Sequence, residues 1–194
     1  MPQPYLATSD AAEVVFGVSV VVFAVGELQQ TLLVRRSDAH ASIRDELIFR
    51  LWFFAGIIAL PTGARFIPGA EAPGPLIFAV GAVVCWLGLL LRWWSFAVLG
   101  RYFTTVVKTS PDQPIIDRGP YRFVRHPGYT GLILAFLGCG LMLGNWAATA
   151  VSVAVVTSAL VVRLLQEERA LIAARGSAYL EYAERRARLI PFVW

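Results

Sequence analysis

Five long apolar runs constrain the fold of this 194-residue chain more than any other feature of its sequence. An α-helix needs about 20 apolar residues to cross a bilayer core of about 30 Å. The runs cover roughly residues 12–34, 47–67, 75–97, 128–144 and 147–165. Only 15% of the residues are charged, against about 25% in soluble proteins. The sequence therefore predicts an all-α integral membrane protein with five transmembrane helices, in one domain over residues 1–194.

The connector between the last two runs is only three residues long, Gly144-Asn145-Trp146. So short a turn predicts a tight helical hairpin of spans four and five. From about residue 163 the chain keeps helical spacing but its charges alternate. This pattern predicts a C-terminal amphipathic helix that leaves the membrane.

Basic residues are distributed very unevenly among the connectors. Sixteen of the 17 Lys and Arg residues fall in the first connector, the third connector or the tail. Arg92 is counted with the third connector, and Arg65 is the exception. The positive-inside rule assigns a face of this kind to the cytoplasm. We therefore expect the N-terminus outside and the C-terminus inside, with no affinity for nucleic acid.

The densest polar stretch is "RGPYRFVRHPGYTG", residues 118–131, which lies on the same face. Pro127 fits the first turn of span four, so Arg125 and His126 come to the N-terminus of that helix. Unpaired N–H groups there favour an anionic group. The same stretch is also compatible with a snorkelling arginine beside an interfacial His and Tyr.

A second polar cluster follows span five. Glu167 and Glu168 come directly after the apolar run, and Arg163 precedes Glu167 by one helical turn. Since the hairpin returns span five to the start of span four, the two clusters should meet in one cytoplasmic pocket. Ionisable residues at the edge of the hydrocarbon are candidates for function.

Metal and disulfide chemistry are not indicated. Cys85 and Cys139 lie in separate spans, and His40 and His126 are far apart. We expect both cysteines to be packing residues and no metal site.

The segment "GPYRFVRHPGYTG", the tight hairpin and "EERALIAARGSAYLEYAERRARLIPF" together resemble the isoprenylcysteine carboxyl methyltransferase family, which is related to membrane phospholipid methyltransferases. The resemblance covers about residues 99–192, which would form the methyltransferase core, and leaves spans 12–97 as the variable part. Arg169 departs from the family pattern, because it follows only two acidic residues.

The resemblance implies an S-adenosylmethionine-dependent methyltransferase with a lipophilic acceptor that enters from the bilayer. The family's catalytic arginine positions correspond to Arg163 and Arg125. Its cofactor pocket corresponds to Ile115, Ile116, Gly119, Tyr121, His126, Pro127, Tyr129, Gly131, Glu167 and Glu168.

Several alternatives remain at this stage. The acceptor is a carboxylate, as in isoprenylcysteine O-methylation, or an amine, as in phosphatidylethanolamine N-methylation, or a thiol. A membrane sterol-type reductase and a non-catalytic scaffold are the alternatives from other classes. Glu27, Gln29 and Gln30 in span one either line the acceptor cavity or bond between helices.

Overall fold

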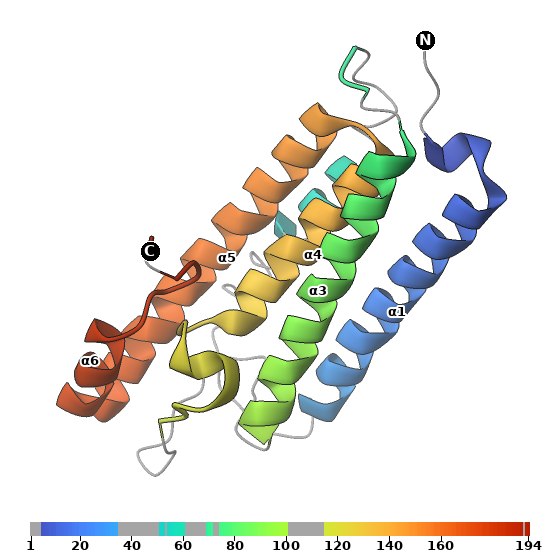
Figure 1. The fold of residues 1–194 in the computed structure, drawn as a ribbon. Coiled ribbons are helices and arrows are strands. Elements are labelled where there is room, and N and C mark those ends of the chain that lie inside the picture. Colours follow the sequence, from blue (N-terminus) through green and yellow to red (C-terminus); the bar gives the residue numbers. More distant parts are fainter. Residues whose placement is uncertain are drawn as a thin grey trace.

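The computed structural model describes residues 5–34, 51–52, 54–60, 69–71, 74–100, 115–191 and 193–194. Four helices run side by side along the length of the molecule, and a short fifth helix packs near one end (Figure 1). They are α1 (Asp10–Val34), α3 (Pro75–Leu99), α4 (Pro127–Leu143), α5 (Trp146–Arg175) and α6 (Ser177–Glu184). Two 3-10 turns, Tyr5–Thr8 and Gly119–Arg122, precede α1 and α4 respectively.

The predicted all-helical membrane fold is confirmed. By length and composition α1, α3 and α5 are each able to cross a membrane, whereas α4 is a shorter apolar helix of 17 residues. The second expected span, 47–67, lies largely outside the described residues, although 51–52 and 54–60 are helical.

The hairpin between α4 and α5 forms where the sequence predicts it. Pro127 occupies the first turn of α4, where its missing N–H leaves no hydrogen bond unmade. Gly144 ends the helix in the left-handed conformation, with φ at 68°. The side chain of Asn145 then caps α5 by accepting a hydrogen bond from the Ala148 N–H at 2.9 Å.

The helical tail expected from about residue 163 is continuous with the helix of span five. Instead of ending near residue 165, α5 continues without a break to Arg175. Its last three turns consist mainly of Leu, Ala, Glu and Arg, which are strong helix formers. The break comes at Gly176, whose φ is 54°, and α6 follows as a separate short helix.

Helices α3 and α4 approach each other very closely. A Cβ added to Gly88 would lie 2.5 Å from the Gly131 carbonyl oxygen, and one added to Gly81 would lie 2.8 Å from that of Gly138. Small residues let membrane helices pack backbone against backbone. Since α4 is held this tightly, the first turn of α4 is well placed to carry a site.

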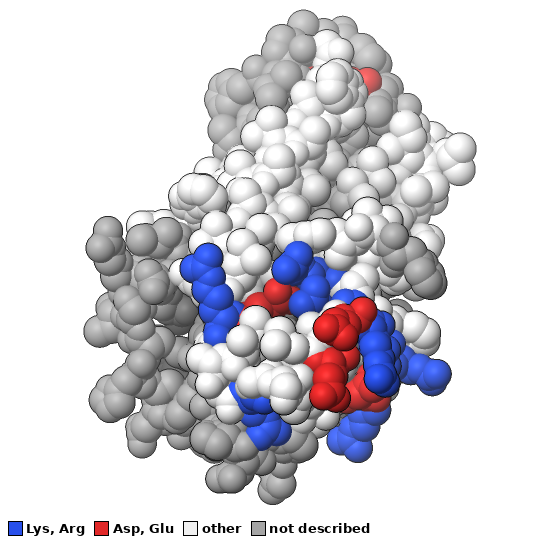
Figure 2. Space-filling view, turned by 90° about the vertical axis from the view of Figure 1, so that its left-hand side faces the viewer, with Lys and Arg blue, Asp and Glu red and all other residues white. Residues whose placement is uncertain are grey.

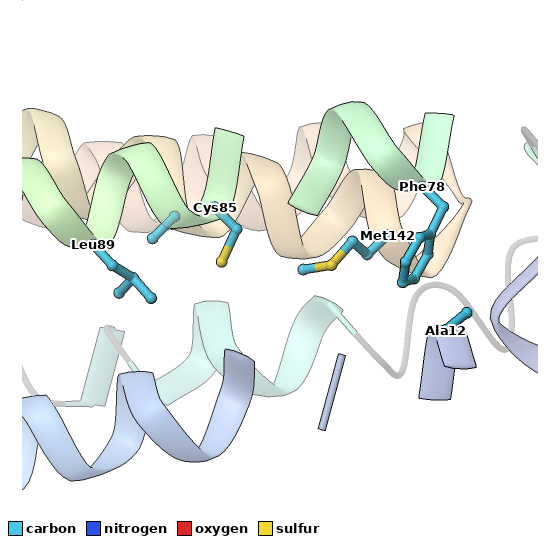
Figure 3. Close-up of a cluster of buried hydrophobic side chains, with 6 residues drawn as sticks. Ala12, Phe78, Cys85, Leu89 and Met142 are labelled. Carbon is cyan, nitrogen blue, oxygen red and sulfur yellow. The ribbon is translucent and has the colours of Figure 1, made fainter. Parts of the chain in front are cut away.

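Helix α1 packs across an apolar cluster formed by the other helices. Phe78, Cys85 and Leu89 of α3, with Met142 of α4, point toward α1 (Figure 3). The sulfur atoms of Cys85 and Cys139 lie 3.7 Å apart as free thiols. They pack as expected, but no feature of the sequence indicated that they touch.

Arg92 lies in a different place from the one expected. From the sequence it was expected in the third connector, whereas the structure buries it within α3, with 8% of its surface exposed. Its guanidinium binds Glu27 of α1 at 2.5 and 2.7 Å. Glu27 therefore bonds between helices, while the Gln29 side chain is exposed. The Gln30 side chain is outside the described part.

Charged side chains gather toward one end of the molecule. Figure 2 shows them over α6 and the adjoining loop, with a largely uncharged surface above them and acidic atoms again near the opposite end. Among the described residues, none at the opposite end, where α1, α3 and α5 begin, is Lys or Arg. The bundle therefore has one ionic end with basic and acidic side chains, and an opposite end whose described charged residues, Asp10, Glu13 and Glu71, are all acidic.

Candidate functional site

The loop that precedes α4 is held by the end of the chain. Arg125 N–H donates to the Ala187 carbonyl at 2.8 Å, and His126 N–H donates to the Arg188 carbonyl at 3.0 Å. The Thr130 hydroxyl donates to the Leu189 carbonyl at 2.7 Å. These contacts fix the backbone of the loop, so the side chains of Arg125 and His126 are positioned from both sides.

Glu168 of α5 lies at the centre of an ionic cluster. Its Oε1 lies 2.7 Å from Nη1 of Arg125 and 3.3 Å from Nε2 of His126. Its Oε2 accepts a hydrogen bond from Arg188 Nε at 3.0 Å. Only 5% of Glu168 is exposed. A carboxylate can be buried this deeply because three donors surround it.

Glu167 forms the other half of the site. It accepts a hydrogen bond from the Tyr129 hydroxyl at 2.5 Å, and Arg163 Nε lies 3.6 Å from the same oxygen. Nδ1 of His126 lies 3.6 Å from Oε2 of Glu167, and the His126 ring stacks on Tyr129. His126 therefore lies between the two carboxylates and joins the two halves of the cluster.

These carboxylates also control the charge of His126. Burial disfavours the imidazolium, but hydrogen bonds and charges from Glu167 and Glu168 outweigh it and raise the pKa of His126 above its ordinary value. The protonated ring can then donate from both nitrogens.

The cluster retains one unused donor. The buried Nε of Arg125 has no hydrogen-bond partner within the described ranges. Three guanidinium groups and an imidazole face only two carboxylates here. The residues present therefore fit a ligand with a carboxylate, which would take the remaining donor capacity.

The other residues predicted for the cofactor site surround this cluster or support it. Gly119, with φ at 59°, packs against Val98 of α3. Pro127 is buried. The backbone of Gly131 contacts Gly88 of α3, and this close packing of two helices explains why residue 131 is a glycine. Ile116 is half-buried at the start of the loop.

Ile115 lies apart from the cluster, on a surface hollow of about 240 Å³. The hollow is bounded on its other side by α6 and the following turn, including Glu181, Tyr182 and Arg186. Tyr182 also donates a hydrogen bond to the Tyr121 carbonyl at 2.8 Å. Tyr121 is thereby tied to α6, between the hollow and the ionic cluster. Burial, with the charge of Glu167 and then Tyr182, raises the pKa of Tyr121 above its ordinary value.

Arg188 and Tyr179 were missed by the sequence analysis as site residues. Arg188 binds Glu168, and Tyr179 is buried, where burial and the Glu168 charge raise its pKa to about 12. A signal was present for Tyr179, because it opens the "YLEY" motif. Arg188 was seen only as one basic residue of the tail.

Within the described part of the chain, no group of His, Cys, Asp or Glu is arranged to hold a metal ion. A zwitterionic ligand would find both acidic and basic partners in this cluster. Its acidic and basic groups are paired with one another. The chemistry it supports is therefore electrostatic positioning more than proton transfer.

Fold and site together define a polytopic helical membrane protein with a buried ionic site at one end of the bundle. Comparison with known proteins indicates a particular family within this class. Residues 80–173 match the model of the isoprenylcysteine carboxyl methyltransferase family. The matched segment includes most of α3, all of α4 and nearly all of α5.

Individual relatives agree with this assignment. The chain is 32% identical over 115 residues to protein-S-isoprenylcysteine O-methyltransferase A of Arabidopsis thaliana, and the match covers 58% of each chain. It is 30% identical over 109 residues to protein-S-isoprenylcysteine O-methyltransferase of Schizosaccharomyces pombe, covering 55% of this chain and 46% of that protein. The chain thus matches about half the length of these relatives.

A solved structure shares the fold. The eukaryotic intramembrane Ras methyltransferase, isoprenylcysteine carboxyl methyltransferase, superposes with a TM-score of 0.68 at 20% identity. The superposition covers 92% of this chain and 65% of the other. The shared architecture therefore extends well beyond the segment that the family model matches.

Proposed function

We propose that this protein is an S-adenosylmethionine-dependent methyltransferase that methylates the carboxylate of a lipophilic, isoprenylcysteine-type acceptor. The observation that carries the proposal is the ionic cluster of Arg125, His126, Tyr129, Glu167 and Glu168, which lies inside the family-matched segment. The names of the relatives support the activity and the acceptor class.

The residues of the cluster would hold the polar part of the cofactor. The free donor of Arg125 suits its carboxylate, and the carboxylates of Glu167 and Glu168 suit its ammonium group and hydroxyls. In this proposal Ile116, Gly119, Tyr121, Pro127 and Gly131 form the surrounding wall and support, whereas Ile115 lines the neighbouring hollow. Bound S-adenosylmethionine supplies an electrophilic methyl group on a sulfonium.

A carboxylate acceptor suits the state of these residues better than an amine. An amine must lose a proton during methylation, whereas a carboxylate attacks the methyl carbon without losing one. Bound S-adenosylmethionine would supply the methyl group for the new C–O bond and would leave as a neutral thioether. Glu167 and Glu168 are both engaged with cations, which makes them weak bases. Arg163 is positioned to orient the acceptor carboxylate.

The site's position favours an acceptor that arrives through the bilayer. We propose five spans, with the N-terminus outside and the ionic end in the cytoplasm, because the described Lys and Arg residues lie toward that end. A water-soluble cofactor would then reach the loop at 115–131 from the cytosol. Residues 99–192 would form the catalytic core, and spans 12–97 would adapt it to the acceptor.

An acceptor panel tests the proposal. Purified protein in vesicles receives methyl-labelled S-adenosylmethionine with farnesylcysteine, with its carboxyl-amidated form, or with phosphatidylethanolamine. We expect label in farnesylcysteine as a base-labile ester, and none in the amide. Label in phosphatidylethanolamine alone would instead establish N-methylation.

A further inference from the structure

A buried ion pair joins three helices next to the site. Arg92 of α3 binds both carboxylate oxygens of Glu27 in α1, and its Nη1 donates to the Gly128 carbonyl of α4 at 2.9 Å. The Arg92 side chain is 10% exposed and that of Glu27 is 27% exposed. The Arg92 guanidinium also stacks over the Phe96 ring at 4.6 Å.

Stability alone does not explain why this pair is present. A buried ion pair loses hydration on folding, and well-packed apolar residues of similar volume are often as stabilising or more so. What an apolar side chain cannot do is donate to a backbone carbonyl. The contact from Arg92 to Gly128 is therefore the distinctive one.

Gly128 is one residue from the ionic cluster. It precedes Tyr129, which donates to Glu167 and stacks on His126. A Cβ added to Gly128 would lie 3.7 Å from the Phe96 ring and 3.9 Å from Arg92 Nη1. The first turn of α4 thus rests on a surface made by Arg92 and Phe96, and this turn sets where Tyr129 points.

We propose that Glu27 and Arg92 are positioning residues: Glu27 orients the Arg92 guanidinium, which fixes the first turn of α4 and thereby holds Tyr129 against Glu167. The consequence for catalysis rests on the proposed function, since it takes Tyr129 and Glu167 as part of the cofactor site. The effect of the ion pair on the order of the first turn of α4 does not depend on the proposed function.

The test compares two variants of the pair with a matched control. Arg92→Lys keeps the cation but cannot bond Glu27 and the Gly128 carbonyl with one planar fork. Glu27→Gln keeps the shape but removes the orienting charge. Ser19→Ala is the control: it removes the Ser19 hydroxyl, which accepts from Trp86 Nε1 at 3.1 Å, another bond between α1 and α3 that does not touch α4.

The primary readout is hydrogen exchange of the full-length protein over residues 128–132, beside thermal unfolding and binding of S-adenosylmethionine. In Arg92→Lys we expect exchange there to rise about tenfold, as for the loss of one hydrogen bond from a charged donor. Glu27→Gln should change it in the same direction, and both variants should bind the cofactor more weakly. Ser19→Ala should lower the unfolding temperature without either effect.

The proposal would be overturned if the exchange rate over residues 128–132 in both pair variants matched that in Ser19→Ala. The ion pair would then only tether the helices to one another. If Arg92→Lys does not fold, Glu27→Gln decides by the same measurement. Failure of the wild-type protein to bind S-adenosylmethionine would refute the proposed function, while the exchange result would still decide the positioning role.

Discussion

The substitution Glu168→Gln, which removes the Glu168 charge, should destabilise the protein strongly. The coupling free energy of Glu168 should differ between its two arginine partners. Glu168 contacts Arg125 at 2.7 Å and Arg188 at 3.0 Å. Loss of one member of a buried ion pair costs about 3–5 kcal/mol, because the remaining charge has neither partner nor water. We expect a loss of folding free energy of about this size.

The two partners differ in exposure, which sets how the loss divides. The Arg125 side chain is 12% exposed, whereas that of Arg188 is 30% exposed and can be rehydrated. We expect a coupling free energy of about 3 kcal/mol between Glu168 and Arg125, and of about 1 kcal/mol between Glu168 and Arg188.

Double-mutant cycles measure both couplings, with Glu168→Gln combined in turn with Arg125→Gln and Arg188→Gln. Free energies of unfolding come from reversible denaturation in detergent, and the control is Ser19→Ala, which should show no coupling to Glu168→Gln. Equal couplings for the two arginines, or a larger one for Arg188, would refute the reasoning from burial.

Three further predictions address pH, Arg163 and topology. Because the pKa of His126 is raised on folding, the contribution of His126 to stability is complete below about pH 6.5 and is lost as pH rises through the folded pKa. Thermal unfolding should show this decline in the wild-type protein and not in His126→Gln. Arg163→Lys should keep cofactor affinity but lose turnover, because an ammonium lacks the two-pronged geometry of a guanidinium; retained activity with a lowered melting temperature would instead mark a structural bridge to Glu167. A cysteine at Thr8 should be labelled from outside the cell and one at Glu181 only from the cytoplasm, in a background without Cys85 and Cys139; labelling of both from one side would contradict the proposed orientation.

Local signals were sufficient for most of the fold. Apolar runs predicted α1, α3, α4 and α5, and Pro127 and Gly144 predicted the ends of α4 within one residue. They succeeded because membrane length and turn chemistry act over a few residues. The end of α5 was missed because a change from apolar to charged residues marks a change of environment. It does not break a helix.

The rest depended on contacts between distant residues. Counting charges placed Arg92 in a connector, since nothing near it in sequence reveals that Glu27 is its partner, 65 residues earlier. Arg188 likewise joins Glu168 only because the chain turns back after α6. The meeting of His126 with Glu167 and Glu168 was predicted because the hairpin is short enough to fix which helix ends are adjacent.

Equilibrium binding of labelled S-adenosylmethionine to the purified protein tests most directly whether the ionic cluster is a cofactor site. Saturable binding is expected in wild type and in Ser19→Ala, whereas His126→Ala and Glu167→Ala should each weaken it by about 1–3 kcal/mol, the effect of leaving a buried polar partner unsatisfied. Affinity unchanged in both site variants, with each still folded, would contradict the assignment of the cofactor to this cluster.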